Sequence, residues 1–273
     1  MKDLELFKTW LMEEEKSSLT VAKYLRDVGA FREWLGDRPL SKTETLRFKI
    51  WLVDRYAVAS VNSMLSSLNC FLSWIGRGEC RVKILKTQNQ GFRSEERELS
   101  REEYCRLLRA SQGDRRLYLL LQAICATGIR VSEHRFLTVE ALRQGKASVR
   151  CKGKVRTVFI PKKLCRVLLS YARELGIRSG PVFVSRKGTP LDRSRIWAMM
   201  KSLCAKAGVD AKKVFPHNLR HLFARIYYAM ERDIVRLADI LGHSSINTTR
   251  IYTADTGETH RRQIERMPLL GIT

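Results

Sequence analysis

Residues 242–252 read GHSSINTTRIY, a polar stretch that follows an apolar helix face and ends in a tyrosine. The apolar face stops at Gly242, and glycine commonly ends helices. The serines that follow His243 can cap a further helix through INTTRIYT, and a hydroxyl-rich helix start suits a neighbouring phosphate. Considered alone, the segment is explained better by Tyr252 closing a core than by Tyr252 acting as a nucleophile. The choice therefore depends on which other side chains the fold brings to His243 and Tyr252.

A helix junction at residues 126–137, ATGIRVSEHRFL, places an arginine beside exposed backbone amides. One helix ends at Thr127-Gly128 and another is predicted to begin almost at once, so Arg130 lies at a sharp bend. Amides at a helix start, combined with a guanidinium, form a good site for a phosphate or an oxyanion. Glu133 falls on the same helical face and is placed to orient neighbouring basic groups. The alternative is an ordinary surface arginine near a helix end.

A second basic cluster is PHNLRHLFA, residues 216–224. A helix that opens at the proline carries His217, Arg220 and His221 on one face. Basic groups on one face of an otherwise apolar helix are costly unless they meet anions. The two histidines also have the spacing of a metal pair, but the zincin glutamate and a third ligand are missing from the sequence. Phosphate contact is therefore favoured, and His221 as a structural histidine stays an alternative.

Strand character is found in residues 147–161, ASVRCKGKVRTVFIP. Two stretches rich in β-branched residues flank the turn Lys152-Gly153-Lys154, which predicts a β-hairpin. A lysine at such a tip can approach a leaving oxygen and protonate it if its pKa is lowered. Solvated lysines are common in turns, so this segment is weak support when it is considered alone.

The charge balance favours a polyanionic partner. Lys and Arg number 51 against 28 Asp and Glu, a net charge of +23. Residues 1–88 contribute only +4 of this excess, so most of the charge belongs to the remainder of the chain. Such a surface suits phosphate neutralisation with counterion release. Ribosomal association and a merely basic surface are the alternatives.

Other features of the composition indicate the cellular setting. No apolar run approaches the roughly 18 residues that cross a bilayer, and the N-terminal MKDLELFKTWLMEEEK is too acidic for a signal peptide. We therefore expect no membrane association and a cytoplasmic location. The seven cysteines are odd in number and lack a CxxC pair, so we expect reduced thiols rather than disulfides or structural zinc.

The periodicity of apolar residues predicts two domains. Residues 1–86 contain four amphipathic helical stretches, which predict a helical domain. Because this domain lacks a catalytic-type cluster, we assign it to binding. Residues 87–98 lose periodicity and form the linker. Residues 99–273 are mainly helical with the one antiparallel hairpin, so the fold class is mainly α with a small β element. Capping boxes are expected at Ser41 with Glu44 and at Ser100 with Glu103.

Together, ATGxRxSE, a KG hairpin, HxLRH and LGHxxxxTTxxY, in this order and at these separations, resemble the tyrosine recombinase (phage integrase) family. The resemblance covers the whole chain, which is similar in compactness to Xer-type recombinases. It implies a helical core-binding (SAM-like) DNA-binding domain, followed by the family's α+β catalytic domain from about residue 97. The family's catalytic positions and their acidic supporter map onto Arg130, Lys152, His217, Arg220, His243, Tyr252 and Glu133. Cys151 stands where a glycine often precedes the hairpin lysine, and Lys154 is the alternative general acid.

The resemblance implies a site-specific recombinase that cleaves and rejoins double-stranded DNA through a 3′-phosphotyrosyl intermediate, without a cofactor or a metal ion. Integration or excision of a mobile element, inversion and resolution use the same chemistry. A homo-tetramer on two duplexes is implied, with the tail at 257–273 docking into a neighbour or back onto its own domain. An accessory DNA-bending protein or a partner recombinase is compatible with this scheme. The alternatives are a non-catalytic sequence-specific DNA-binding protein on the same fold and a type IB-like topoisomerase.

Overall fold

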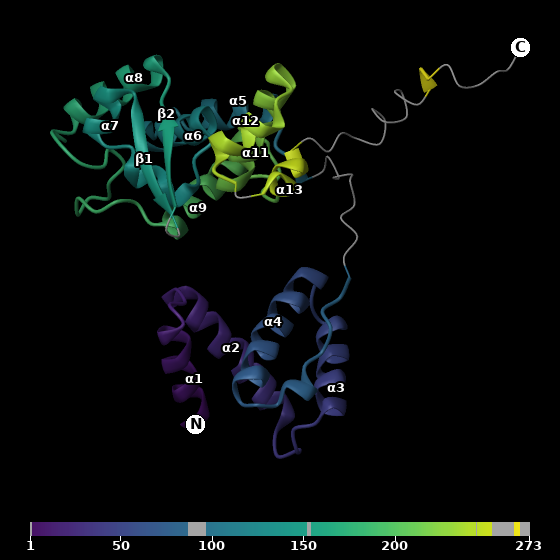
Figure 1. Ribbon diagram of the computed structural model, residues 1–273. Helices are drawn as coiled ribbons and strands as arrows, with labels where there is room; N and C mark the ends of the chain where they lie inside the picture. The colour runs from purple at the N-terminus through teal and green to yellow at the C-terminus, as the bar shows by residue number, and fades with distance from the viewer. Residues whose placement is uncertain (1, 87–96, 152–153, 244, 253–264, 268–273) are drawn as a thin grey trace, which may run out of the picture. The chain divides into compact units, whose positions relative to one another are not determined.

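The structure is a computed structural model, and it describes residues 2–86, 97–151, 154–243, 245–252 and 265–267 (Figure 1). The chain divides into two compact units, Met1–Asn89 and Gln90–Thr273. Most of the expected linker and tail, together with Lys152 and Ser244, lie outside the described residues. Among the described residues, no helix is both long enough and apolar enough to cross a membrane.

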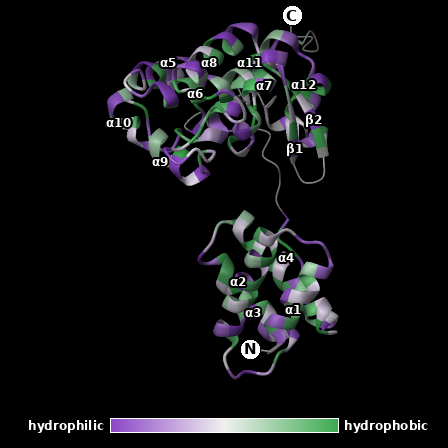
Figure 2. Cartoon of the chain, turned by 90° about the vertical axis from the view of Figure 1, so that its left-hand side faces the viewer, coloured by the Kyte–Doolittle hydropathy of each residue, from purple (hydrophilic) through white to green (hydrophobic). Residues whose placement is uncertain are grey.

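The first unit is helical, as its four amphipathic stretches predict. It consists of α1 (Lys2–Glu13), α2 (Ser18–Leu35), α3 (Lys42–Val53), α4 (Val58–Trp74) and the short 3-10 helix η1 (Gly78–Cys80). Ser17 caps α2 by accepting a hydrogen bond from the Thr20 amide. Two clusters of buried apolar side chains join the helices. In Figure 2 the helices of this unit carry both hydrophobic and hydrophilic residues. A helix buries its apolar stripe in this way because burial supplies most of its stability.

The predicted capping box at Ser41 is only half formed. Ser41 Oγ accepts from the Glu44 amide at 3.2 Å, as expected for an N-cap. The Glu44 carboxylate does not return to the Ser41 amide and instead binds Arg38 and Arg47, each at 2.7 Å. Two charged donors are stronger partners for a carboxylate than one backbone amide. At Ser100, where Glu103 has one lysine partner in Lys213, both halves of the expected box are present.

The second unit has three named α-helices and a 3-10 helix ahead of its strands. Its first elements are α5 (Arg101–Ala110), α6 (Arg115–Thr127), the 3-10 helix η3 (Val131–Phe136) and α7 (Val139–Gln144). The second helix of the predicted junction is therefore a 3-10 turn rather than an α-helix. Strands β1 (Lys146–Cys151) and β2 (Lys154–Phe159) follow as an antiparallel pair, with Cys151 opposite Lys154. This confirms the predicted hairpin.

The remaining elements of the second unit are helical. They are α8 (Lys162–Glu174), α9 (Arg193–Ser202), α10 (Cys204–Ala207), α11 (Pro216–Glu231), α12 (Ile234–Leu241), α13 (Ile246–Thr249) and the 3-10 helix η4 (Arg250–Tyr252). Leu203 separates two of these helices, because it ends α9 and begins α10. One large core joins α5 to α10 and the sheet, and α11 packs along α6 within it. The α6–α11 contact brings the two basic sequence clusters together.

Candidate active site

The bend after α6 depends on a glycine. Gly128 caps α6 in the left-handed conformation, with φ of +63°. A Cβ placed on it would lie 2.4 Å from Cδ1 of Phe223 on α11, so only glycine allows this close approach. The chain then turns into η3, for which Arg130 is the N-cap residue. The glycine in the ATG motif therefore sets the position of Arg130 beside α11.

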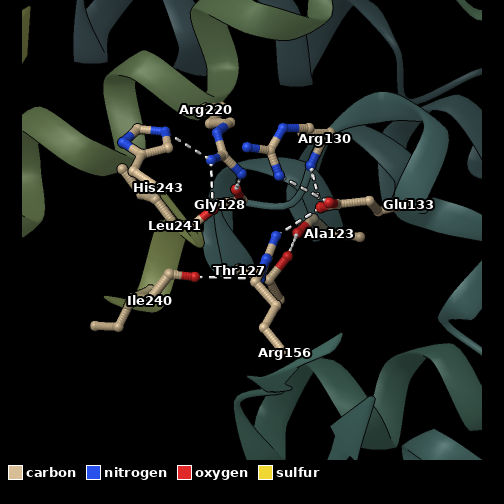
Figure 3. Close-up of polar contacts among 10 residues, drawn as sticks. All are labelled: Ala123, Thr127, Gly128, Arg130, Glu133, Arg156, Arg220, Ile240, Leu241 and His243. Carbon is tan, nitrogen blue, oxygen red and sulfur yellow. Dashed lines mark hydrogen bonds and ion pairs between the residues drawn. The ribbon is translucent and has the colours of Figure 1, made fainter. Parts of the chain in front are cut away.

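Glu133 is the acidic centre of the site, and its side chain is only 2% exposed. Its Oε2 accepts from the Arg130 amide at 2.7 Å, and its Oε1 accepts from Arg130 Nη1 at 3.0 Å (Figure 3). Oε2 also accepts from Arg156 Nη2 at 2.6 Å. A buried carboxylate is tolerated because these charged donors satisfy it. This contact set fits the expected role of Glu133 as the supporter of a basic site.

Arg220 is the most deeply buried cation of the site, at 1% exposure. Its Nη1 donates to the Gly128 carbonyl and its Nη2 to the Leu241 carbonyl, both at 2.6 Å. These carbonyls lie at the C-terminal ends of α6 and α12, where helix dipoles concentrate negative charge. Burial, followed by the nearby Arg130, lowers the pKa of Arg220 to about 10, so the guanidinium is still protonated at neutral pH. The fold thus holds a buried positive charge with backbone groups.

His243 adjoins Arg220 in a defined tautomer. Arg220 Nη2 lies 3.1 Å from His243 Nε2, and His243 Nδ1 lies 2.9 Å from Thr249 Oγ1. A guanidinium can only donate, so Nε2 must accept and Nδ1 carries the proton. Burial, then the charges of Arg220, Arg130 and Arg156, lower the pKa of His243 to about 4. The imidazole is therefore neutral near pH 7.

Tyr252 lies in the same place, at 4% exposure. Its ring stacks beside that of His243, with centroids 5.9 Å apart and planes 16° from parallel. The His221 ring meets the Tyr252 ring edge-on, with centroids 4.7 Å apart. The His217 and His221 ring centroids are 4.3 Å apart. The apolar residues behind Tyr252 are Ala224, Leu237 and Leu241. Both interpretations of Tyr252 thus have support, because it closes a small core and also adjoins the cationic site.

The structure brings together most of the predicted site residues and adds one. Arg130, Glu133, Arg220, His243 and Tyr252 converge, and His217 joins them through the histidine row on α11. Lys152 lies outside the described residues, and Lys154 is placed only as the first residue of β2. The missed residue is Arg156. A signal for it exists, because Arg156 shares the inward face of β2 with buried Val158.

A metal pair at the two α11 histidines was the alternative interpretation of this helix. Among the described residues, no group of three or more His, Cys, Asp or Glu side chains is arranged to hold a metal ion. The charged groups that do gather are cations around one carboxylate. Arg130, Arg156 and Arg220 against Glu133 give a net charge of +2 while His243 is neutral. That set is suited to an anion.

Comparison with known proteins shows the family of the chain. A sequence model of the Phage integrase family matches residues 97–258. The chain is 31% identical over 281 residues to the tyrosine recombinase XerA of Pyrococcus furiosus, covering 98% of this chain and 94% of that protein. It is 32% identical over 279 residues to XerA of Thermococcus kodakarensis, covering 98% and 95%. The chain therefore belongs to the phage integrase family of tyrosine recombinases. It is a site-specific DNA recombinase, as its motifs predict.

Solved structures resemble the chain as well. A crystal structure of XerA recombinase matches with a TM-score of 0.55 and 28% identity, covering 98% of this chain and 99% of that one. The XerH recombinase, in its post-cleavage complex with palindromic difH substrate, matches with a TM-score of 0.73 and 21% identity, covering 91% and 80%. The second likeness shows the fold. The fold class predicted from the sequence is confirmed.

Proposed function

We propose that Tyr252 attacks a phosphodiester of double-stranded DNA and forms a 3′-phosphotyrosyl bond. The bond between tyrosine Oη and phosphorus forms while the bond from phosphorus to the 5′-oxygen breaks. Lys152 donates a proton to the departing 5′-oxygen, and the tyrosine proton passes to His217. The covalent bond retains the energy of the phosphodiester, so a 5′-hydroxyl from a second duplex can rejoin the strand without a cofactor.

The observation that carries this proposal is the cluster of positive charge near Tyr252, of which Arg220 is the buried member. A phosphodiester carries one negative charge, and attack by a tyrosinate brings the total in the transition state to two. The net +2 of Arg130, Arg156, Arg220 and Glu133 matches this total. Preorganised charge of this kind stabilises a transition state without reorganisation. Arginines in other phosphoryl transfers contribute ~10³–10⁵ in rate, so loss of Arg130 or Arg220 is expected to nearly abolish cleavage.

The two units take different parts in this proposal. The helical unit Met1–Asn89 binds the DNA core site, and Gln90–Thr273 contains the catalytic residues. Two DNA duplexes are held by four copies of the chain, an arrangement supported by the solved lambda integrase tetramer bound to a Holliday junction. The proposed location is the cytoplasm, because the DNA of a cell without organelles lies there.

The test uses a nicked duplex that traps the covalent intermediate. The target site is first obtained by sequencing DNA bound in cells to the Tyr252→Phe variant, which retains the ring and its packing. Purified wild-type chain in EDTA should then form a covalent adduct on that site, and Tyr252→Phe should bind equally and trap nothing. Peptide mapping identifies the residue that carries the DNA. An adduct at another residue would refute the assignment.

The alternatives predict different products. A type IB-like topoisomerase relaxes supercoiled plasmid without exchanging strands between two duplexes, whereas the proposed enzyme yields recombinant products when two sites are supplied. A non-catalytic DNA-binding protein yields neither an adduct nor a product. Exchange by the purified chain alone would also show that no accessory DNA-bending protein or partner recombinase is required.

A further inference from the structure

Arg156 is a half-buried cation on the inward face of strand β2. Along β2, Val155, Thr157 and Phe159 face solvent, whereas Arg156 alternates with buried Val158. The Arg156 side chain is 14% exposed. A cation at an inward strand position costs free energy unless it is paired and hydrogen-bonded. Its partners therefore indicate what it does.

Arg156 binds two separate elements with two different nitrogens. Its Nη2 donates to Glu133 Oε2 on η3 at 2.6 Å, and its Nη1 donates to the Ile240 carbonyl near the end of α12 at 3.1 Å (Figure 3). These acceptors lie 23 and 84 residues away in the sequence. One guanidinium thus connects the hairpin strand, the junction that carries Arg130, and the helix end that precedes His243.

The path of the Arg156 side chain crosses the backbone at Gly242. A Cβ on Gly242 would lie 2.3 Å from Arg156 Cδ and 2.7 Å from its Nε. Gly242 also has φ of +66°, a conformation that favours glycine. Gly242 of the LGH motif therefore has two roles. It terminates α12, and it leaves room for the Arg156 side chain immediately before His243.

The two contacts of Arg156 lead to the two groups of residues that are proposed to hold the phosphate. Glu133 Oε2 also accepts from the Arg130 amide, so Arg156 and Arg130 share one carboxylate oxygen. Ile240 is followed by Leu241, whose carbonyl holds Arg220. We propose that Arg156 is a positioning residue that fixes the separation between Arg130 and the Arg220–His243 pair, so that both sides engage one phosphate. This inference rests on the proposed function.

The need for two nitrogens explains why the residue is an arginine. Its planar fork offers donors in fixed, divergent directions, whereas a lysine ammonium is a single point. Arg156→Lys keeps the charge but cannot hold both acceptors with the same geometry. Arg156→Met keeps much of the apolar stem and loses both contacts. Arg150→Met is the matched control, because Arg150 lies exposed on the adjoining strand β1 and faces Val155 in the register.

The experiment measures single-turnover formation of the Tyr252 adduct at saturating DNA, so that weaker binding does not affect the rate. A displacement of about 1 Å in a catalytic group can cost ~10²-fold, and Arg156→Met should lose roughly this much. Arg156→Lys should fall between Arg156→Met and wild type, and Arg150→Met should stay close to wild type. Thermal melting of each variant identifies loss of fold. If Arg156→Met does not fold, Arg156→Lys provides the test.

Modified substrates separate positioning from mere structural support. A methylphosphonate at the scissile position removes the charged oxygen that the arginines must meet, so the deficit of Arg156 variants relative to wild type should shrink about tenfold. A 5′-bridging phosphorothiolate, which needs no general acid, should leave that deficit unchanged. The inference would be overturned if the deficit of the Arg156 variants were unchanged on methylphosphonate or were removed by the phosphorothiolate. It would also be overturned if Arg156→Met reacted as fast as the Arg150→Met control. If wild type and Arg150→Met both fail to form the adduct, the proposed function itself is wrong.

Discussion

The hydroxyl of Thr249 should allow His243 to carry its proton on either ring nitrogen. Thr249 is fully buried, and its Oγ1 lies 2.9 Å from His243 Nδ1. In the DNA-free structure Nδ1 must donate, because Nε2 accepts from Arg220. To donate to a phosphate from Nε2, the neutral ring must instead accept at Nδ1. A threonine hydroxyl can be acceptor or donor and supports both tautomers, whereas the valine methyl in Thr249→Val supports neither.

The size of the effect follows from one buried hydrogen bond. Valine has nearly the shape of threonine, so Thr249→Val opens no large cavity and leaves one ring nitrogen without a partner. Such an unsatisfied buried group costs ~1–3 kcal/mol. If the cost falls on the transition state, adduct formation slows by roughly 5-fold to 150-fold, since about 1.36 kcal/mol corresponds to a factor of ten. The free energy of unfolding should decrease by a similar amount, ~1–3 kcal/mol.

The assay is single-turnover adduct formation on the nicked substrate, with denaturant unfolding measured in parallel. Thr248→Val is the control, because Thr248 is the adjacent threonine and is exposed. Thr249→Ser retains the hydroxyl and should keep most of the activity. Nitrogen-15 spectra of the free protein should show the proton of His243 on Nδ1. Equal rates and stabilities for the two valine variants, or a proton on Nε2 in the free protein, would refute the reasoning.

Three further outcomes are expected. Gly128→Ala forces an L-residue to φ of +63° and places its Cβ 2.4 Å from Phe223, so denaturant titration should show a loss of at least about 2 kcal/mol; a smaller loss would mean that the bend relaxes easily. The pKa of His243 is about 4 in the fold against 6.5 ordinarily, so the unfolded chain binds the proton first as pH falls. Stability should therefore decrease from about pH 6.5 towards pH 4, by about 1–2 kcal/mol at pH 5, and His243→Gln should flatten that slope. Rescue by a 5′-bridging phosphorothiolate should occur for Lys152→Ala and be absent for Lys154→Ala; the reverse would make Lys154 the general acid.

Local rules predicted the elements of this fold well and failed where tertiary partners competed. The Ser100–Glu103 capping box is present as predicted. Glu44 instead binds two arginines, which the capping-box spacing does not predict. The turn after Gly128 became a 3-10 helix in which the Glu133 carboxylate binds the Arg130 amide and side chain. Periodicity describes one element at a time. It does not predict which partner a side chain binds when residues from different elements compete for it.

The site shows the same division between side chains and backbone. Arg130, Arg220 and His243 were predicted from motifs, and the structure brings them together. The partners of Arg220 are the carbonyls of Gly128 and Leu241, which no residue type reveals. Arg156 lies outside the motifs that predict the site, although a cation on the inward face of a strand is itself a signal.

The placement of Tyr252 beside Arg220 and His243 of its own chain has a genetic consequence. Each subunit contains its proposed nucleophile together with its own buried arginine and histidine. Two defective alleles, one lacking the tyrosine and the other lacking Arg220, therefore cannot restore cleavage to each other when they are expressed together. Mutations that remove these groups should belong to a single complementation group, and a cell that carries both alleles should have the phenotype of either one.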